Sequence, residues 1–223
     1  MRDLLEFDGI ELSYGTRKIL SGIYMQCSVG EIVGVLGRNG SGKSSLFKVV
    51  FGSQAADHRS VRFNDSTLPD DFIRRRIIGY LPQTHLIPPH VTIARAMELF
   101  EVESDQILRY FPDLEQQLSL RPSELSGGYR RVIELVLILK SRSLFCVLDE
   151  PFSGVMPVHV EAIGKMLVEV KAEKGIILTD HLYRNVMSTA DRLYILSNGT
   201  TYPVRSQDDL IARGYLAPNP PGI

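Results

Sequence analysis

A glycine-rich segment between an apolar run and an expected helix constrains the fold of this chain more than any other feature. Residues 32–36 are short, apolar and rich in β-branched side chains, which predicts a buried strand. Residues 43–51 predict a helix that stops at Gly52. Between them the sequence reads Gly37-Arg38-Asn39-Gly40-Ser41-Gly42-Lys43-Ser44, which matches G-x-x-x-x-G-K-[ST] at every fixed position. Strand, loop and helix in this order predict a phosphate-binding loop.

The residue types in this loop suit a triphosphate, which carries more negative charge than side chains alone easily neutralise. Glycines let the backbone N–H groups and the N-terminus of the following helix approach the phosphates. Lys43 adds a positive charge, and Ser44 supplies a hydroxyl oxygen for Mg²⁺. The predicted nucleotide-binding residues of the loop are Gly37, Arg38, Asn39, Gly40, Ser41, Gly42, Lys43, Ser44 and Ser45.

Two adjacent carboxylates follow another apolar run. Residues 144–148 predict a strand, and Asp149 and Glu150 come directly after it, at the carboxyl edge where open α/β sheets bind ligands. By itself, an Asp-Glu pair after a strand is more often a turn or a helix cap. Together with the phosphate loop, the pair predicts one metal ligand and one residue that orients water for in-line attack on the terminal phosphate. We assign the metal to Asp149 and the water to Glu150.

A second helix start also carries the residues of an anion site. Ser126-Gly127-Gly128 precedes residues 129–140, which predict a helix. A Ser-Gly-Gly start offers N–H groups, a hydroxyl and the helix dipole to an anion. The chain therefore has two candidate anion sites at helix starts but only one phosphate-loop lysine.

The order of the other elements predicts one large sheet covered by helices. Alternating apolar residues at 10–14 and 23–29 predict two half-buried strands near the N-terminus, and later strands are expected at 176–179 and 193–196. Strands that alternate with helices imply βαβ crossovers and a largely parallel, buried sheet. Residues 84–120 differ, because their apolar side chains recur at helical spacing and predict a small helical subdomain.

Composition argues against several classes of protein. The chain has 223 residues, of which 44% are hydrophobic, so it is long enough to bury a core and is not disordered. Its 25 basic and 26 acidic residues give a net charge of −1, and no nucleic-acid partner is expected from such a balance. No apolar run approaches the length of about 18 residues that spans a bilayer, and the N-terminus lacks a signal-peptide core. We expect a chain that neither spans a membrane nor is exported.

Three smaller features have plain structural explanations. Cys27 and Cys146 lie in apolar runs without metal-ligand spacing, so buried thiols are expected, as suits a reducing cytosol, instead of a zinc site or a disulfide. The three arginines at 74–76 are expected to be a solvated basic face, with contact to a partner or to lipid headgroups as the alternative. The prolines within 217–223 predict a frayed tail.

Together these motifs resemble the nucleotide-binding subunits of ABC transporters, whose signature sequence reads Leu-Ser-Gly-Gly-Gln. The resemblance extends over nearly the whole chain. It implies an α/β fold: a P-loop NTPase core with a mostly parallel sheet, an N-terminal antiparallel β-subdomain and an inserted α-helical subdomain. Residues 1–223 would form a single ABC ATPase domain, in which 1–83 and 126–223 build the catalytic core and 84–125 the helical subdomain.

The resemblance also implies roles for single residues. Tyr14 corresponds to the aromatic residue that stacks on adenine, although its pattern alone indicates a half-buried strand tyrosine. Gln83 is similar to the glutamine that touches metal and water, and His181 to the histidine that contacts the γ-phosphate. The predicted catalytic residues are then Glu150, His181 and Gln83, and the predicted metal ligands are Ser44, Gln83 and Asp149. The histidines at 58, 85, 90 and 159 have no such correspondence and are expected to be solvated.

In this family two cassettes pack head to tail, and each ATP lies between the phosphate loop of one and the signature of the other. Such a dimer explains the second anion site at Ser126, Gly127 and Gly128, because a two-fold interface brings two different patches together. The resemblance therefore implies an ATPase with ATP and Mg²⁺ as cofactors that pairs with an identical or a different cassette. It would drive transmembrane permease subunits on separate chains and would be bound through them to the cytoplasmic face of the cell membrane.

Two other functions remain open at this stage. A soluble ABC ATPase of chromosome maintenance or translation would usually carry coiled-coil insertions or tandem cassettes, and neither is found in the sequence. An ATP-gated module with weak hydrolysis is motivated by Met156, which stands where the family has an aspartate. Two further departures are Tyr129 in place of the signature glutamine and a short helical subdomain at 84–124.

Overall fold

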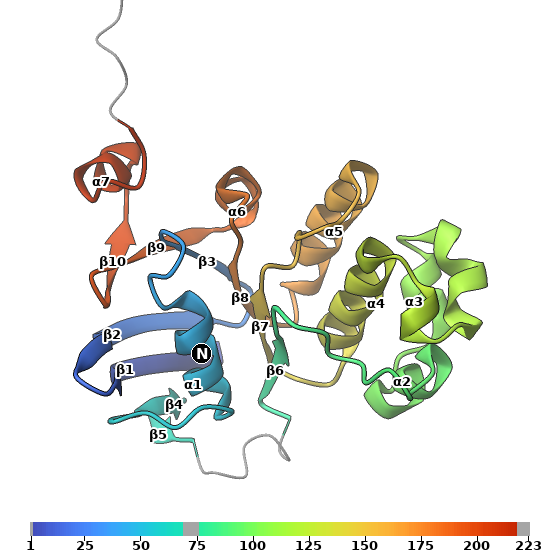
Figure 1. Ribbon diagram of the computed structural model, residues 1–223, viewed down its shortest axis with the longest axis horizontal. Helices are drawn as coiled ribbons and strands as arrows, with labels where there is room; N and C mark the ends of the chain where they lie inside the picture. The colour runs from blue at the N-terminus through green and yellow to red at the C-terminus, as the bar shows by residue number, and fades with distance from the viewer. Residues whose placement is uncertain (1, 69–75, 218–223) are drawn as a thin grey trace, which may run out of the picture.

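The computed structural model describes residues 2–68 and 76–217, which form two β-sheets with helices packed around the larger one (Figure 1). The smaller sheet contains β1 (Leu4–Tyr14), β2 (Arg17–Ser28), β4 (Val61–Phe63) and β5 (Ser66–Thr67). The larger sheet contains β3 (Ile32–Leu36), β6 (Ile78–Leu81), β7 (Phe145–Asp149), β8 (Gly175–Thr179), β9 (Arg192–Ser197) and β10 (Thr200–Val204). The α-helices are α1 (Lys43–Phe51), α2 (Ile93–Phe100), α3 (Ser104–Leu108), α4 (Gly127–Lys140), α5 (Pro157–Val170), α6 (Tyr183–Thr189) and α7 (Gln207–Ala212).

The larger sheet has the strand order β10-β9-β3-β8-β7-β6, and its neighbouring strands are parallel except for β9 and β10. β3 lies between β8 and β9, two strands that come much later in the chain. Ligands of open α/β sheets bind at such points, outside the carboxyl ends of the strands. The segment that follows β3 is the glycine-rich loop, so the topology places this loop at the expected binding edge.

Side chains alternate between the two faces of the larger sheet, and each face has its own core. On β3, Val33 and Val35 pack into a cluster that includes residues of α1 and the smaller sheet. Ile32 and Leu36 point the other way, into a cluster that includes residues of α4 and α5. β7 and β8 alternate in the same manner. A sheet buried on both faces explains why its strands appear in the sequence as unbroken apolar runs.

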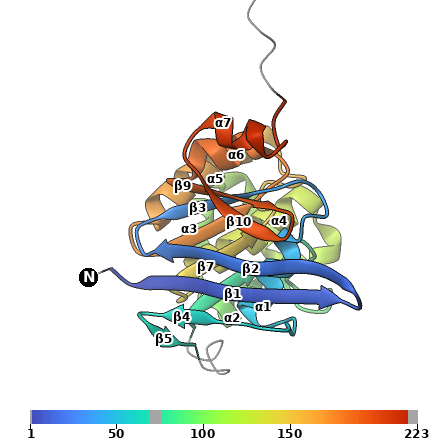
Figure 2. The ribbon, with the colours of Figure 1, turned by 90° about the vertical axis from the view of Figure 1, so that its left-hand side faces the viewer.

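The smaller sheet is antiparallel, and polar contacts tie it to β10. Thr201 Oγ1 donates to the carbonyl of Tyr24 (2.8 Å) and accepts from its N–H (3.1 Å). The N–H of Ser21 donates to the carbonyl of Gly199 (2.7 Å). Figure 2 shows β10 beside β2 at this junction. These contacts fix β2 relative to the larger sheet.

The segment between β6 and α4 consists of short helices. Besides α2 and α3 it contains two 3₁₀ helices, η1 (Pro112–Ser119) and η2 (Pro122–Glu124). A proline begins each 3₁₀ helix, and α2 ends at Glu101 in a left-handed conformation (φ 59°). The apolar side chains of this segment pack against α4 as the helical spacing predicted, but prolines and the turn at Glu101 keep the helices short. The boundaries 84 and 125 of a helical subdomain stay a prediction.

Several other expectations can be compared with the structure. The predicted strand 32–36 and helix 43–51 coincide with β3 and α1, and the sheet is largely parallel as expected. Cys27 and Cys146 are buried free thiols, which confirms that prediction. Of the basic run at 74–76 only Arg76 lies within the described residues; it is exposed and paired with Glu101 (2.6 Å). Residues 218–223 of the expected frayed tail lie outside the described residues. Among the described helices, none is long and apolar enough to cross a membrane.

The packing around β3 leaves no room for a side chain at Gly34. A Cβ there would lie 2.6 Å from side-chain carbons of both Leu193 and Val186. We expect Gly34→Ala to lower the free energy of unfolding by about 1–3 kcal/mol, the usual cost of overpacking a core. Gly164→Ala is the matched control, because a Cβ on this residue of α5 would meet nothing within 4 Å and should stabilise the helix by about 0.5–1 kcal/mol. Chemical denaturation measures both; equal stabilities would contradict this packing.

Candidate functional site

The glycine-rich loop turns tightly between β3 and α1. Gly42, directly before α1, has a left-handed conformation (φ 104°), and a Cβ there would lie 3.1 Å from Ile19 and 3.2 Å from Leu20. No side chain caps the start of α1, so the N–H groups of its first turn are available to a ligand. The positive end of the helix dipole lies at the same place. The loop and the helix start together form an anion site.

Lys43, the first residue of α1, donates from Nζ to the carbonyl oxygens of Gly37 (2.7 Å) and Arg38 (3.2 Å). Burial lowers the pKa of its ammonium group, and the nearby carboxylates of Glu150 and Asp149 oppose this shift. A partly desolvated ammonium ion held by two carbonyl oxygens gains a stronger, charge-assisted partner when a phosphate binds. Lys43 is therefore positioned for the role that its motif predicts.

Asp149 ends β7 and is only 1% exposed. No described residue makes a hydrogen bond of normal geometry to either carboxylate oxygen, although the hydroxyls of Ser44 and Tyr80 interact with this group. Burial raises the pKa of the carboxyl, and Ser44 opposes the shift. Gln83 lines the same cavity as Ser44. This set of oxygen donors fits Mg²⁺, which is usually bound through one or two protein oxygens, phosphates and retained waters. The described residues contain no cluster of three or more His, Cys, Asp or Glu side chains that could hold a metal without a phosphate.

Glu150 has a backbone conformation that residues other than glycine rarely adopt (φ 57°). Its N–H donates to the carbonyl of Thr179 (2.8 Å), and its own carbonyl accepts two bonds from Arg131 (3.2 and 3.1 Å). Such strain persists only where the surroundings determine it, and it is concentrated at functional sites. The structure thus holds the Glu150 side chain at the edge of the sheet by contacts to its backbone.

His181 follows β8 and lies beside Glu150. Its Nδ1 is 3.6 Å from the carboxylate of Glu150 and 3.4 Å from that of Asp180. Asp180 is buried and accepts the N–H groups of Phe152 and Leu182, each at 2.9 Å. The loops after β7 and β8 are therefore joined by one carboxylate, which sequence analysis did not single out.

A cavity of about 600 Å³ brings most of the predicted residues together. It is lined by Tyr14, Arg17, Ile19, Asn39, Gly40, Ser41, Gly42, Lys43, Ser44, Ser45, Gln83, Glu150 and His181. The volume is usual for a small-molecule site. Tyr14 is 55% exposed, so the half-buried position indicated by its pattern is wrong, and its hydroxyl accepts a bond from Gln54 (2.7 Å). Of the predicted loop residues, Gly37 and Arg38 lie outside this lining.

The second predicted anion site lies outside this cavity. Ser126 caps α4 by accepting the N–H of Tyr129 (3.3 Å), and Ser126 and Gly127 are both exposed. Gly128 packs on the segment that follows Glu150, since a Cβ there would lie 2.7 Å from the carbonyl oxygen of Gly154. The structure therefore confirms a helix start of the expected kind but does not bring it to the phosphate loop of its own chain.

Tyr129 contacts a buried histidine. Its ring centroid lies 5.6 Å from that of His159, which packs edge-on against Phe111 at 5.4 Å. His159 Nε2 lies 3.0 Å from the carboxylate of Asp113, and burial together with Asp113 raises the pKa of Tyr129. His159 is 4% exposed, so the expectation that it is solvated is wrong: η1 covers it and supplies its partner. The expectation holds for the exposed histidines at 58, 85 and 90.

Sequence analysis missed Arg131, which joins the ends of two strands to α4. Its guanidinium donates to the carbonyl oxygens of Pro82 (2.7 Å), directly after β6, and of Asp149 and Glu150 at the end of β7. Burial lowers the pKa of Arg131, and the surrounding carboxylates oppose this. A single side chain in the first turns of α4 therefore fixes the backbone on either side of the cavity.

Glu134, one turn further along α4, is fully buried and was also missed. It accepts the N–H groups of Leu86 (3.0 Å) and Ile87 (3.1 Å) and a bond from Arg130 (3.0 Å). The loop that carries Gln83 is thus tied to the helix that begins at the Ser-Gly-Gly segment. The available signal was three charges inside an otherwise apolar helical run, because buried charges in such a run need partners.

A phosphate loop at the end of β3, with a buried carboxylate and a strained glutamate at the end of the parallel strand β7, defines a P-loop nucleotide-binding protein. Comparison with known families specifies the class further. Residues 20–153, more than half of the chain, match the family model described as ABC transporter. The chain therefore belongs to the ABC transporter family, which confirms the resemblance seen in the motifs.

Three curated relatives are similar over most of their length. The lipopolysaccharide export system ATP-binding protein LptB of Haemophilus influenzae is 31% identical, and the alignment covers 96% of this chain and 97% of that protein. LptB of Escherichia coli K12 is 32% identical over 92% and 93% of the two chains. The high-affinity branched-chain amino acid transport ATP-binding protein BraG of Pseudomonas aeruginosa is 27% identical over 88% and 90%.

Solved structures show the same fold. An ATP-binding subunit of an ABC transporter superposes with a TM-score of 0.80 at 25% identity, covering 96% of this chain and 95% of that one. A dimeric bacterial ABC transporter cassette superposes with a TM-score of 0.77 at 21% identity, covering 91% and 99%. The expected α/β fold with a mostly parallel sheet and a separate antiparallel sheet is therefore confirmed.

The burial of His159 leads to a stability test. We expect His159→Ala to lower the free energy of unfolding by about 2–4 kcal/mol, because it removes a buried ring packed against Phe111 and Tyr129 and leaves a cavity. His90→Ala is the control, since that side chain is exposed and its loss should change stability by less than about 0.5 kcal/mol. Urea unfolding followed by circular dichroism measures both. Similar small effects for the two variants would mean that η1 does not cover His159.

A second test concerns the buried carboxylate of Asp149. Burial raises the pKa of Asp149, so the contribution of this group to folding stability is fully present below the ordinary pKa of aspartate. That contribution is lost as the pH rises through the raised pKa. At neutral pH the ionised carboxylate therefore lowers the free energy of unfolding. Asp149→Asn should therefore raise the Tm of the nucleotide-free protein, by about 2–4 °C for each kcal/mol relieved. Glu98→Gln, on an exposed pair with Arg95, should leave Tm unchanged. A lower Tm for Asp149→Asn would contradict this account.

Proposed function

We propose that this protein is the ATP-hydrolysing subunit of a membrane transporter and works as one of two cassettes beneath membrane-spanning subunits on separate chains. The observation that carries the proposal is the cavity in which Lys43, Ser44 and Glu150 lie together. Membership of the ABC transporter family supports it, as do relatives named as ATP-binding proteins of transport systems.

The phosphates of ATP would lie along the loop from Gly37 to Ser45. The uncapped first turn of α1 supplies N–H groups, and Lys43 exchanges its carbonyl partners for phosphate oxygens. The exposed ring of Tyr14 lines the same cavity and would pack on the adenine. The cavity thus offers an aromatic surface to the base and a positive, amide-lined surface to the phosphates.

Ser44, Gln83 and Asp149 would hold Mg²⁺. When bound, this ion neutralises phosphate charge and polarises the terminal phosphoryl group. The support is the buried Asp149 carboxylate, whose pKa stays raised because Ser44, Arg131 and Lys43 compensate its burial only in part; a bound cation would compensate the rest. Ser44 and Gln83, which line the same cavity, would contribute neutral oxygen atoms.

Glu150 would orient the attacking water and accept its proton as the water oxygen bonds to the terminal phosphorus and the bond to the leaving diphosphate breaks. Its backbone is fixed by Thr179 and Arg131, so the carboxylate needs little reorganisation during the reaction. His181, 3.6 Å from that carboxylate, would contact the γ-phosphate. The chain itself would thus position the attacking water and the γ-phosphate and would accept the proton of the water.

Ser126, Gly127 and Gly128 would bind the γ-phosphate that a second cassette holds. Two observations support this: the helix start is exposed, and it lies outside the phosphate-loop cavity of its own chain. A two-fold interface pairs two different patches of each subunit, so one dimer would contain two ATP molecules. An identical chain and a related one both satisfy this geometry.

Closure on ATP would reach the membrane subunits through Gln83 and residues 84–125. Arg131 and Glu134 support this route, because they tie the helix that begins at the signature to the loop that carries Gln83. A movement of α4 is thereby passed to that loop. In this arrangement the protein lies at the cytoplasmic face of the membrane, held by its partner subunits.

An ATP-gated module with slow hydrolysis is the second candidate. Met156 is the N-cap residue of α5 and is 43% exposed, and it stands where the family has an aspartate. A methionine cannot make the charged contact that an aspartate would make across a dimer interface. Turnover of the unmodified protein distinguishes the two functions.

The role of Glu150 gives the test of the proposal. We expect Glu150→Gln to slow hydrolysis by roughly 10²–10⁴-fold with ATP affinity changed only a few-fold, because an amide cannot accept the proton from water. Glu161→Gln is the control, on an exposed ion pair of α5. Phosphate release measures turnover, and light scattering should detect ATP-dependent dimers that accumulate in the Glu150 variant. Unchanged turnover in Glu150→Gln would assign the water elsewhere, and near-zero turnover of the unmodified protein would favour the gated module.

A further inference from the structure

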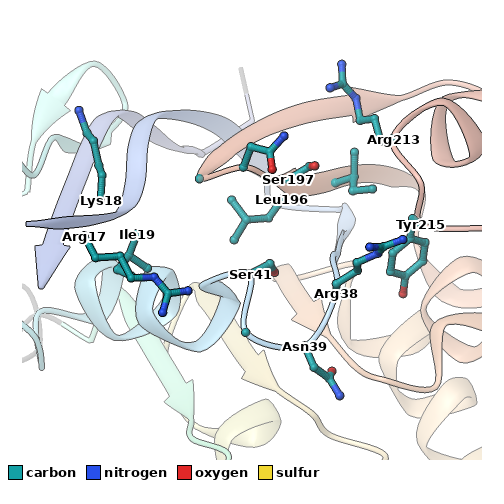
Figure 3. Close-up of a pocket in the computed structure, with 14 residues that line it drawn as sticks. Arg17, Lys18, Ile19, Arg38, Asn39, Ser41, Leu196, Ser197, Arg213 and Tyr215 are labelled. Atoms are coloured by element: carbon teal, nitrogen blue, oxygen red, sulfur yellow. The ribbon is translucent and has the colours of Figure 1, made fainter.

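We propose that the protein has a second ligand site, beside the ATP cavity, that binds a phosphate-bearing small molecule or headgroup. A cavity of about 480 Å³ lies between the phosphate loop, the start of β2, the turn between β9 and β10 and the residues after α7 (Figure 3). It shares part of the phosphate loop, as well as Arg17 and Ile19 of β2, with the ATP cavity but contains neither Lys43, Ser44 nor Glu150. It is therefore a neighbouring cavity that lacks the residues expected to act on the phosphates of ATP.

The lining of this cavity has one sign of charge. Arg17, Lys18, Arg38 and Arg213 line it, and no acidic side chain does. Such a lining does not follow from composition, since the chain has 25 basic and 26 acidic residues. Within the described residues only Lys18 has an ion-pair partner, the partly exposed Glu11 at 3.4 Å. Arg17, Arg38 and Arg213 form no ion pair with a described residue, and only the more distant Asp209 acts electrostatically with Arg213. The net positive charge of the lining therefore favours a bound anion.

Two of these arginines are held by contacts that leave donors free. Arg38 donates to the carbonyl oxygen of Gly214, just after α7. The guanidinium of Arg213 stacks on the ring of Tyr202, 3.3 Å from the centroid. Stacking uses the face of the guanidinium and leaves its edge donors for a ligand. Figure 3 shows Arg17 on one side of the loop and Arg38 and Arg213 on the other.

Ser41 adds a polar group that lacks a partner. Its hydroxyl is buried without a hydrogen bond to any described residue, and Ser41 lines this cavity. Buried hydroxyls are nearly always bonded, and because Ser41 also lines the ATP cavity, its partner can arrive through either cavity. Ser197 and Asn198, in the turn after β9, supply further hydrogen-bonding groups. The site therefore has both charge and directional donors.

The ligand class follows from this combination. Arginine forks match phosphate oxygens in geometry and in charge. The cavity is larger than a free phosphate needs and has the size of a small-molecule site, so a phosphorylated compound or a phospholipid headgroup fits better than inorganic phosphate. Arg17, Ile19, Asn39, Gly40 and Ser41 line both cavities, so any effect of occupancy here on ATP binding is matched by an equal effect of ATP on this site.

The test is a calorimetric titration of inorganic pyrophosphate into the full chain, with the ATP cavity saturated by the non-hydrolysable analogue AMPPNP and Mg²⁺ in excess over both. We expect one pyrophosphate per chain. Arg213→Gln should weaken this binding by roughly tenfold or more, because a charge-assisted hydrogen bond contributes about 1.5–3 kcal/mol. Arg213→Lys should fall between, since it keeps the charge and loses the fork. Arg95→Gln, an exposed residue of α2 outside the cavity, should bind as the unmodified protein does.

Sedimentation with phosphatidylcholine vesicles, with and without phosphatidylglycerol, forms the second arm. Binding to the anionic vesicles that Arg213→Gln reduces and Arg95→Gln does not would identify a headgroup as the source of the phosphate, and pyrophosphate binding alone would identify a soluble compound. Binding in neither arm, or equal binding by the Arg213→Gln and Arg95→Gln variants, would overturn the proposal. A failure of the ATP site would appear differently, as absent AMPPNP binding and a second equivalent of pyrophosphate in the phosphate loop.

Discussion

The geometry of the site depends on one buried guanidinium. Arg131 is 7% exposed and donates to backbone carbonyl oxygens of Pro82, Asp149 and Glu150, which belong to the ends of two neighbouring strands. A buried arginine is costly unless its donors are satisfied, and here backbone dipoles and nearby carboxylates satisfy it. Because the left-handed backbone of Glu150 accepts two of these bonds, the strain at that residue and the burial of Arg131 stabilise each other.

Local chemistry made part of this structure predictable from the sequence. The other elements depend on pairing between distant segments, which a local sequence pattern does not reveal. The phosphate loop has a single workable geometry, so β3, α1 and the positions of Lys43 and Ser44 follow from a few residues. β4 and β6 have only three and four residues and are strands because β1 and β7 pair with them, which no local pattern reveals. His159 was misjudged for the same reason, since η1 covers it from a distant part of the chain.

Partly compensated charge is concentrated around the phosphate loop. Burial lowers the pKa of Lys43 on one side and raises that of Asp149 on the other, and unpaired arginines line the neighbouring cavity. A ligand or ion of opposite charge would add to the partial compensation that Lys43 and Asp149 already give each other. Ligands that bind only the folded state stabilise it by mass action, so nucleotide and metal are expected to contribute to folding stability as well as to chemistry.

The contact between Gly128 and the carbonyl of Gly154 has a consequence for the proposed dimer. A Cβ on Gly128 would lie 2.7 Å from the carbonyl oxygen of Gly154, so the signature segment packs directly on the segment that follows Glu150. A shift of either segment toward the other would displace that other segment. In the proposed dimer, the signature touches the neighbour's ATP while Glu150 serves the chain's own. A movement of the signature segment on the neighbour's ATP would therefore also press on the segment that follows Glu150, which couples the two ATP sites of the proposed dimer mechanically.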